Sequence, residues 1–169
     1  DVYKRQRQAG RLASGTVRAL VLYTSGNEVD WPDYLDPVTG DFTYYGDNRS
    51  PGRDLHDTRR KGNSLLRWMF NAARSGPEER VQIPPTFLFE RVGSTRAVMF
   101  RGLAAPGSPR LNDDEELVAV WRTAEKSRFQ NYRAHFTVLN VPTVTREWLD
   151  EIAAGNVLGH HCPEPWKRW

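Results

Sequence analysis

Aromatic and polar side chains gather between residues 31 and 48, and their chemistry suits the binding of a flat, polar ring. Four of them present aromatic faces: Trp31, Tyr34, Tyr44 and Tyr45. Four more present carboxylates or an amide: Asp33, Asp36, Asp47 and Asn48. Aromatic faces can hold an extruded nucleobase while a carboxylate accepts a hydrogen bond from its exocyclic amine. A carboxylate that accepts from N4 distinguishes cytosine from thymine.

A basic segment follows this group directly. Its basic residues are Arg49, Arg53, Arg59, Arg60, Lys61 and Arg67, offset by Asp54 and Asp57. Its formal charge of +4 exceeds the +3 of the whole chain. Guanidinium groups suit phosphates and guanine edges, so these residues are predicted to contact the backbone or groove of DNA. Two simpler explanations stay open: the aromatic residues taken singly are typical of core packing, and a GC-rich genome favours Arg codons.

Other chemistries find less support in the residues. The chain has neither a glycine-rich phosphate loop of the Walker type nor a dinucleotide fingerprint. The residues two places before its four lysines are Val2, Arg59, Ala124 and Pro165, so the acidic residue that a restriction-type nuclease core places there is absent. His160-His161-Cys162 is the one cluster with metal-ligand chemistry, and adjacent residues rarely bind one ion, which favours a surface turn. We expect no metal or other cofactor in this domain.

Two alternatives from other functional classes remain. His56 precedes Asp57, and a carboxylate can orient an imidazole, so a stand-alone hydrolase using His56 and Asp47 is one of them. Neither a Ser nor a Cys nucleophile lies in a recognisable elbow, which weakens this hypothesis. The other is a sheet-based RNA- or peptide-binding module, in which the aromatic residues form an open platform.

The elements that must position these residues are short. Strands are predicted at residues 17–23, 41–45, 86–92, 96–103, 117–121 and 134–139, with an ordered loop at 29–40. Helices are predicted at 64–74, capped by Asn63 or Ser64, and at 146–154, between Thr145 and Gly155. About six strands and two helices without βαβ alternation indicate an α+β fold, with the two helices packed on a curved, barrel-like sheet.

Length and composition fit one compact domain in a soluble, reducing compartment. The chain has 169 residues, 38% of them hydrophobic and 27% charged. Its apolar runs are too short to span a membrane, and neither a secretion signal nor a membrane partner is indicated. A single cysteine, Cys162, excludes an internal disulfide.

Several sequence blocks resemble a known family. They are Phe42-Thr43-Tyr44-Tyr45-Gly46-Asp47-Asn48-Arg49, Leu55-His56-Asp57-Thr58, Gly62-Asn63-Ser64-Leu65-Leu66, and residues 128–139 with Trp148-Leu149. In this order, they resemble SRA-type (SET- and RING-associated) domains over residues 16 to 155. The similarity is closer to the amino-terminal recognition domain of AspBHI-like modification-dependent restriction endonucleases. The implied fold is a mixed, SRA/PUA-like sheet.

The resemblance also implies a function and a site. It implies binding of double-stranded DNA and flipping of 5-methylcytosine, or of 5-hydroxymethylcytosine, with no bond broken by this domain. The tyrosine that stacks on the flipped base corresponds to Tyr44. The pocket aspartate corresponds best to Asp36 and next to Asp33, and the opposing aromatic to Trp31 or, failing that, Tyr34. The element that fills the gap in the duplex has no clear counterpart; the loop from Arg49 to Lys61 or the stretch from Arg91 to Arg101 could supply it.

Domain boundaries follow from the same comparison. Residues 1–6 look like a translated library adaptor, residues 7–15 are an N-terminal tail, and residues 16–158 are the modified-DNA-recognition domain. Residues 159–169 would begin a linker to a C-terminal nuclease domain that lies outside this chain and would hold any divalent metal. The parent would be a type IV or IIM-like restriction endonuclease, in which identical chains could associate.

Overall fold

The computed structural model describes residues 6–11 and 17–169, and side chains from residue 17 onward. The expected adaptor, apart from residue 6, and residues 12–15 of the expected tail lie outside the described residues. The chain forms two compact units, which we describe separately. The first contains Asp1–Gly26, Pro84–Ala105 and Val138–Trp169, and the second contains Asn27–Ile83 and Pro106–Thr137.

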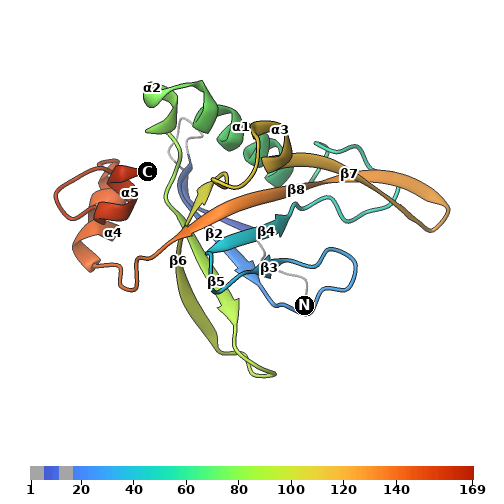
Figure 1. Ribbon diagram of the computed structural model, residues 1–169, viewed down its shortest axis with the longest axis horizontal. Helices are drawn as coiled ribbons and strands as arrows, with labels where there is room; N and C mark the ends of the chain where they lie inside the picture. The colour runs from blue at the N-terminus through green and yellow to red at the C-terminus, as the bar shows by residue number, and fades with distance from the viewer. Residues whose placement is uncertain (1–5, 12–16) are drawn as a thin grey trace. The chain divides into compact units, whose positions relative to one another are not determined.

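The first unit contains a mixed sheet. Its strands are, in spatial order, β1 (Gln6–Arg11), β2 (Val17–Thr24), β5 (Thr86–Arg91) and β6 (Val98–Pro106) (Figure 1). β2 runs parallel to β5, whereas the other two pairs are antiparallel. The strands predicted at residues 86–92 and 96–103 are confirmed as β5 and β6, which form an antiparallel hairpin. β1 lies in the segment that the sequence analysis expected to be a tail. It was missed because its residues, Gln-Arg-Gln-Ala-Gly-Arg, lack the apolar alternation that predicts a strand.

Two helices complete the first unit: α4 (Arg146–Ala154) and α5 (Glu164–Arg168). α4 begins and ends as predicted, since the Thr145 hydroxyl accepts a hydrogen bond from Trp148 N at 3.2 Å and Gly155 has a φ of 88°. α5 lies in the segment expected to begin a linker, and its Trp166 is buried. One buried cluster unites these helices with the sheet: Phe87, Leu103, Ala105, Val141, Trp148, Ile152, Cys162 and Trp166.

The second unit contains an antiparallel sheet covered by a helix. The strand order is β7 (Leu117–Ala124), β8 (Ser127–Leu139), β4 (Asp41–Tyr45) and β3 (Tyr34–Leu35). The long helix α1 (Gly62–Ser75) packs on it through Phe70, whose ring centroid lies 5.2 Å from that of Phe136 on β8. α2 (Pro77–Arg80) and α3 (Asp113–Glu116) are single turns, at positions where the sequence predicts no helix. Elements of four or five residues are too short to show a helical period, which explains why five helices form where two were predicted.

The predicted α+β class and mixed sheet are confirmed, but a barrel is not. Within each unit, the pairings among the described residues leave the strand order open at both ends. In the part of the chain that the structure describes, no helix has the length and apolar character needed to span a bilayer.

The buried Trp148 gives a test of the first unit. Trp148 is fully buried, and its indole N–H donates to Val157 O at 2.8 Å. We expect Trp148→Ala to lower the free energy of unfolding by about 3–5 kcal/mol, because it leaves a large cavity. Leu149→Ala, at the next position and 44% exposed, should change it by less than about 0.5 kcal/mol. Urea unfolding compares the two variants, and equal losses would contradict this packing.

Candidate nucleic-acid interface

Strand β4 presents two different faces. Phe42 and Tyr44 are fully buried, while Asp41, Thr43 and Tyr45 on the opposite face are partly exposed. The ring centroid of Tyr44 lies 6.0 Å from that of Phe42 and 6.3 Å from that of Phe136. Tyr44, the predicted stacking residue, is therefore part of the core of the second unit.

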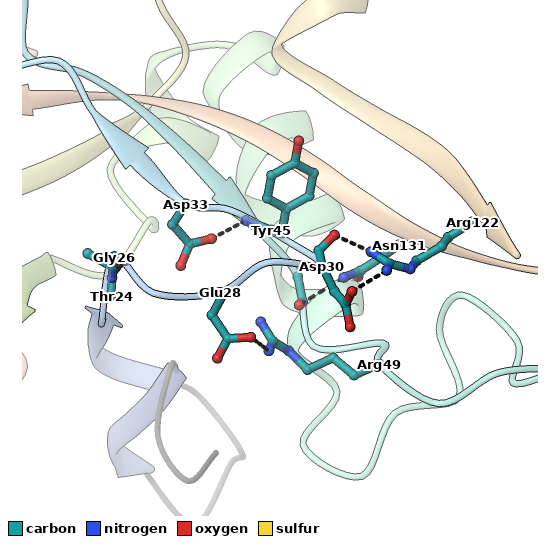
Figure 2. Close-up of polar contacts among 10 residues, drawn as sticks. Thr24, Gly26, Glu28, Asp30, Asp33, Tyr45, Arg49, Arg122 and Asn131 are labelled. Atoms are coloured by element: carbon teal, nitrogen blue, oxygen red, sulfur yellow. Dashed lines mark hydrogen bonds and ion pairs between the residues drawn. The ribbon is translucent and has the colours of Figure 1, made fainter. Parts of the chain in front are cut away.

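The two aspartates predicted for the pocket lie at opposite ends of the β3–β4 pair. Tyr34 pairs with Thr43 and Leu35 with Phe42, so Asp33 reaches the end of β4 that carries Tyr44. There the Asp33 carboxylate accepts a hydrogen bond from Tyr45 N at 2.9 Å (Figure 2).

Asp36 has a different role in the hairpin. Its carboxylate accepts hydrogen bonds from Val38 N at 2.8 Å and Thr39 N at 3.3 Å, which hold its pKa below the usual value. Three residues separate Asp36 from Asp33, which is about 10 Å along a strand. The structure thus brings Asp33, the second choice from the sequence, to Tyr44, and keeps Asp36 in the turn.

The two aromatic residues predicted to oppose Tyr44 do not face it in this structure. The Trp31 ring is buried against Tyr45, at 5.4 Å between centroids, and against Phe129, at 6.0 Å. Tyr45 belongs to the face of β4 opposite to Tyr44, so Trp31 packs on that other face. Tyr34 pairs with Thr43 on the same face and is 63% exposed.

Two arginines fasten the segment that carries Trp31 and Asp33. The Arg122 guanidinium donates to both the backbone oxygen and the carboxylate of Asp30, and lies 5.3 Å from the centroid of the Trp31 ring. Arg49 donates to the Glu28 carboxylate at 2.9 Å (Figure 2). These contacts fix the segment at two points, on either side of Val29.

Arg49 was predicted to contact DNA, and it lies instead in a partly buried electrostatic cluster. Burial lowers its pKa, and this effect is partly offset by the charges of Tyr44 and Asp33, followed by those of Asp47 and Asp30. Arg49 therefore lies close to Asp33, which the β3–β4 register places beside Tyr44. The structure brings these three predicted residues together.

Asp47 and Asn63 bind each other reciprocally where α1 begins. The Asp47 carboxylate accepts from Gly62 N at 3.0 Å and Asn63 N at 2.9 Å, and Asp47 N donates to the Asn63 side chain at 3.1 Å. Asp47 thus caps α1 from 15 residues away, a role that the sequence analysis had given to Asn63 or Ser64. Both oxygens of the Asp47 carboxylate accept hydrogen bonds from the start of α1. The hydrolase alternative would need this carboxylate to bind His56 instead.

Two buried asparagines, Asn48 and Asn131, extend this hydrogen-bond network to the backbone of the basic loop. Asn48 is fully buried, and its amide donates to the backbone oxygens of Arg53, Asp54 and Gln130 at 2.8–3.3 Å. The Asn131 side chain accepts from Asn48 N at 3.2 Å and donates to Gly46 O at 3.0 Å. A Cβ on Gly46 would lie only 1.8 Å from Asn63 Oδ1, so glycine is required there. Asn48 therefore supports the loop.

Asn63 and Asn131 were missed as site-building residues. The signal that could have found them is a polar residue at a buried position of a helix or strand, since such a group needs hydrogen-bond partners.

The loop that this network supports presents basic side chains to solvent. Arg53, Arg59, Arg60, Lys61 and Arg67 are exposed. Lys61 lies 3.8 Å from Asp57, whereas Arg53, Arg59 and Arg67 make no ion pair within the described part of the chain. Arginines elsewhere have carboxylate partners, for example Arg74 with Glu116 and Arg101 with Glu90. The positive charge of this surface is thus left largely uncompensated.

Two histidines in the second unit have lowered pKa values. His56 Nε2 lies 3.1 Å from Tyr132 Oη, and burial, followed by the charge of Arg67, lowers the pKa of His56. Burial also lowers the pKa of His135, although Asp41 opposes this effect. Among the described residues, no group of three or more His, Cys, Asp or Glu side chains is arranged to hold a metal ion.

Asp33 and Tyr44 lie near a loop whose exposed Arg53 and Arg59 make no ion pair with a described carboxylate, an arrangement typical of nucleic-acid recognition, and comparison with known proteins gives the family. The chain belongs to the family described as restriction endonuclease AspBHI N-terminal, whose model matches residues 5–169. The resemblance seen in the sequence is therefore confirmed, and the match includes the residues expected to form a linker. The family model describes an N-terminal domain, which agrees with the expectation that this chain is not itself the nuclease.

Solved structures of modification-dependent restriction endonucleases are similar to this chain. The DNA modification-dependent restriction endonuclease AspBHI is 45% identical with a TM-score of 0.86, over 96% of this chain and 76% of that one. The DNA recognition domain of the cytosine modification-dependent restriction endonuclease LpnPI is 42% identical with a TM-score of 0.80, over 88% of this chain and 66% of that one.

A third structure, the MspJI restriction endonuclease in complex with a 27-mer oligonucleotide, shares the fold at 24% identity with a TM-score of 0.72, over 97% of this chain and 40% of that one. Among curated protein sequences, none matches this chain.

The capping role of Asp47 can be tested directly. We expect Asp47→Ala to lower the free energy of unfolding by about 2 kcal/mol, because it removes the cap of α1 and leaves buried donors unpaired. Asp57→Ala, in the same loop but exposed, should change it by less than about 0.5 kcal/mol. Chemical denaturation measures both. An Asp47→Ala variant of unchanged stability would contradict the assignment.

The lowered pKa values of His56 and His135 predict that the stability of the domain depends on pH. Their lowered pKa values mean that the unfolded chain takes up protons first, near the ordinary value of about 6.5. The free energy of unfolding should therefore fall as the pH is lowered from about 7.5 to about 5.5. Urea unfolding at both pH values measures this fall, which should be smaller for His135→Gln. An increase in stability on acidification would contradict the burial of these rings.

Proposed function

We propose that this chain is the DNA-recognition module of a modification-dependent restriction endonuclease and reads 5-methylcytosine or 5-hydroxymethylcytosine in duplex DNA by flipping the base. Its relatives AspBHI and LpnPI are described as modification-dependent, and LpnPI as dependent on modified cytosine. The observation that carries the proposal is the position of Asp33 beside Tyr44, next to a loop in which Arg53 and Arg59 make no ion pair with any described carboxylate.

The arginine loop would supply most of the affinity. Arg53, Arg59 and Arg67 are exposed and carry uncompensated charge, so phosphates can replace water around them without breaking ion pairs. Arg60 and Lys61 add charge on the same surface. Arg49 would have to leave Glu28 before it could reach a phosphate, so we propose it as a pocket residue. Extruding a base costs a few kcal/mol, which phosphate contacts and stacking must offset.

Asp33 would supply the selectivity for cytosine. A carboxylate at this position can accept a hydrogen bond from N4 of the flipped base, which thymine cannot donate. An apolar contact around the 5-methyl group is worth about 1–3 kcal/mol, by analogy with one methylene in a hydrophobic pocket. Asp36 is the alternative acceptor, at the other end of β4.

The stacking arrangement requires movement on binding. Tyr44 is fully buried, so a base can reach its ring only when the covering side chains give way. The segment from Glu28 to Asp33 is held by Arg49 and Arg122 and includes Trp31. If this segment moved when DNA binds, the Trp31 ring would also be released from its packing. We therefore keep Tyr44 as the proposed stacking residue, with Trp31 or Tyr34 as its partner. The barrel-like curvature of an SRA/PUA-like sheet belongs to the same proposal.

DNA cleavage is assigned to another part of a longer protein. The chain spans 66% of the LpnPI recognition domain and 40% of the MspJI chain, which supports a longer protein with the nuclease in another domain. We propose that this domain works without a cofactor, and that the divalent metal and any association of identical chains belong to the full-length prokaryotic enzyme, in the cytoplasm.

Matched duplexes that carry cytosine, 5-methylcytosine or 5-hydroxymethylcytosine test the proposal. We expect Asp33→Asn to weaken binding of the duplex with modified cytosine about tenfold, since a lost base contact is worth about 1–3 kcal/mol. Binding of plain duplex should change little, because an unmodified cytosine stays in the stack and does not reach Asp33, so the preference for modified DNA falls by the same factor. Arg59→Ala should weaken binding of modified and plain DNA by the same factor, because a phosphate contact carries no sequence information. Fluorescence anisotropy at fixed salt measures both effects.

Asp36→Asn is the matched control for this experiment. It should keep the preference of the wild-type chain, because its carboxylate holds a turn. Loss of preference in Asp36→Asn but not in Asp33→Asn would reverse the assignment of the acceptor. An unchanged preference in both variants, with thermal unfolding unaltered, would refute a carboxylate pocket.

A further inference from the structure

The β7–β8 hairpin is the longest paired element of the second unit. Eight residue pairs join its strands, from Leu117 with Ala134 to Ala124 with Ser127 (Figure 1). Because side chains alternate along a strand, the hairpin has two distinct faces. Arg122 and its partner Phe129 belong to one face, with Asn131. Trp121 and its partner Gln130 belong to the other face, with Arg128.

The first face is fully used inside the domain. Phe129 packs on Trp31, Arg122 binds Asp30, and Asn131 belongs to the buried asparagine network. The hairpin is therefore fastened to the segment that carries Asp33 and to the base of the arginine loop.

Near the turn, the opposite face has no such partners among the described residues, whereas further along β8 the same face carries the buried Tyr132, Ala134 and Phe136. Trp121 is 58% exposed, an unusual position for the largest side chain. The Arg128 guanidinium lies 4.5 Å from the centroid of its ring, and Arg128 makes no ion pair with any described carboxylate. A planar guanidinium stacked on an indole is thus held in a defined orientation at the surface. We call Trp121 and Arg128 the tryptophan–arginine pair.

The turn of this hairpin is strained. Glu125 has a φ of 50° and Lys126 a φ of 63°, so two residues other than glycine take the left-handed conformation. A two-residue turn of this kind ordinarily has Asn-Gly or a similar pair. Strain that the surrounding structure maintains is often associated with function. Here it closes the hairpin tightly and places Lys126 at its tip.

The exposed face continues into the arginine loop. Asn48 Nδ2 donates to Gln130 O at 2.8 Å, and His56 contacts Tyr132, the next residue of β8 on this face. A Cβ on Gly52 would lie 3.7 Å from Ser127 Cβ, so the loop runs beside the hairpin. The stretch from Ser127 to Tyr132 spans about 17 Å, the length of about half a turn of B-form DNA.

We infer that the exposed face of the β7–β8 hairpin is a second DNA contact, which enters the major groove of the duplex flanking the modified cytosine; this rests on the proposed function. A two-stranded ribbon fits the major groove, and an arginine with a fixed guanidinium can bind a guanine edge. Duplex DNA also complements the positive charge that Arg128 and Lys126 share with the adjoining loop. The tryptophan–arginine pair reads the flank, while Asp33 reads the modified base.

Duplex length separates the two contacts. Each duplex carries one 5-methylcytosine, with about 10 base pairs on either side in the long form and about 3 in the short form. Trp121→Ala and Arg128→Ala should weaken binding to the long duplex about 5- to 20-fold, and to the short duplex less than about twofold. The loss on the long duplex should be equal for methylated and plain DNA. Arg128→Ala should also reduce the salt dependence of binding by about one charge.

Two further variants serve as controls. Trp121→Phe should recover part of the affinity, because an aromatic face is kept. Arg146→Ala, at an exposed position of α4 in the first unit, should bind both duplexes like the wild-type chain. Thermal unfolding checks that Trp121→Ala and Arg128→Ala retain wild-type stability, as expected for exposed side chains.

The outcomes separate this inference from the proposed function. Wild-type affinity of Trp121→Ala and Arg128→Ala for the long duplex would overturn the hairpin contact and leave the proposed function standing. Equal losses on short and long duplexes would also overturn it, because the hairpin would then act at the modified base. A wild-type chain that binds methylated and plain duplex alike would refute the proposed function, while a length-dependent loss would still support the flank contact.

Discussion

The rest of the candidate interface depends on the reciprocal hydrogen bonding of Asp47 and Asn63. Asp47 follows β4 by two residues, and Asn63 lies in the first turn of α1, so their contact joins the end of a strand to the start of a helix. Asn131 binds the same Asn63 side chain at 3.0 Å and extends the contact to β8. Buried polar groups are costly unless every partner is present, so this network favours one arrangement of the loop between them. The exposed arginines are thereby presented from a fixed support.

The arginines of this surface have two different roles, which depend on whether they are paired with a carboxylate. Arg49 and Arg122 are paired with Glu28 and Asp30, and they hold the segment that ends at Asp33. Arg53 and Arg59 make no ion pair with a carboxylate of the described residues, and they are exposed to solvent. A paired guanidinium contributes to structure and little to the attraction of an anion, whereas an unpaired one raises the local positive potential. The same residue type thus supports the fold in one place and electrostatic attraction in another.

The β7–β8 hairpin links these two groups of arginines. Its internal face carries Arg122 and Asn131, which hold the segment and the loop, while its exposed face carries the tryptophan–arginine pair. The side chains of both faces are attached to the same two strands, so their positions depend on one another. The proposed flank contact and the proposed base contact are therefore connected by one rigid element.

The sequence by itself determined the local features: β4 at residues 41–45, α4 between Thr145 and Gly155, the β5–β6 hairpin and the arginine-rich loop. Each depends on a period, a cap or a composition that a short window contains. It missed the first half of β8, where Arg128, Gln130 and Asn131 interrupt the apolar pattern, and the polar strand β1. Only the tertiary structure decided that Asp47 caps a helix 15 residues away, that Tyr44 is in the core, and that Asp33 lies nearer to it than Asp36. Strand register and non-local hydrogen bonds fix these positions, and neither is encoded in the neighbouring residues.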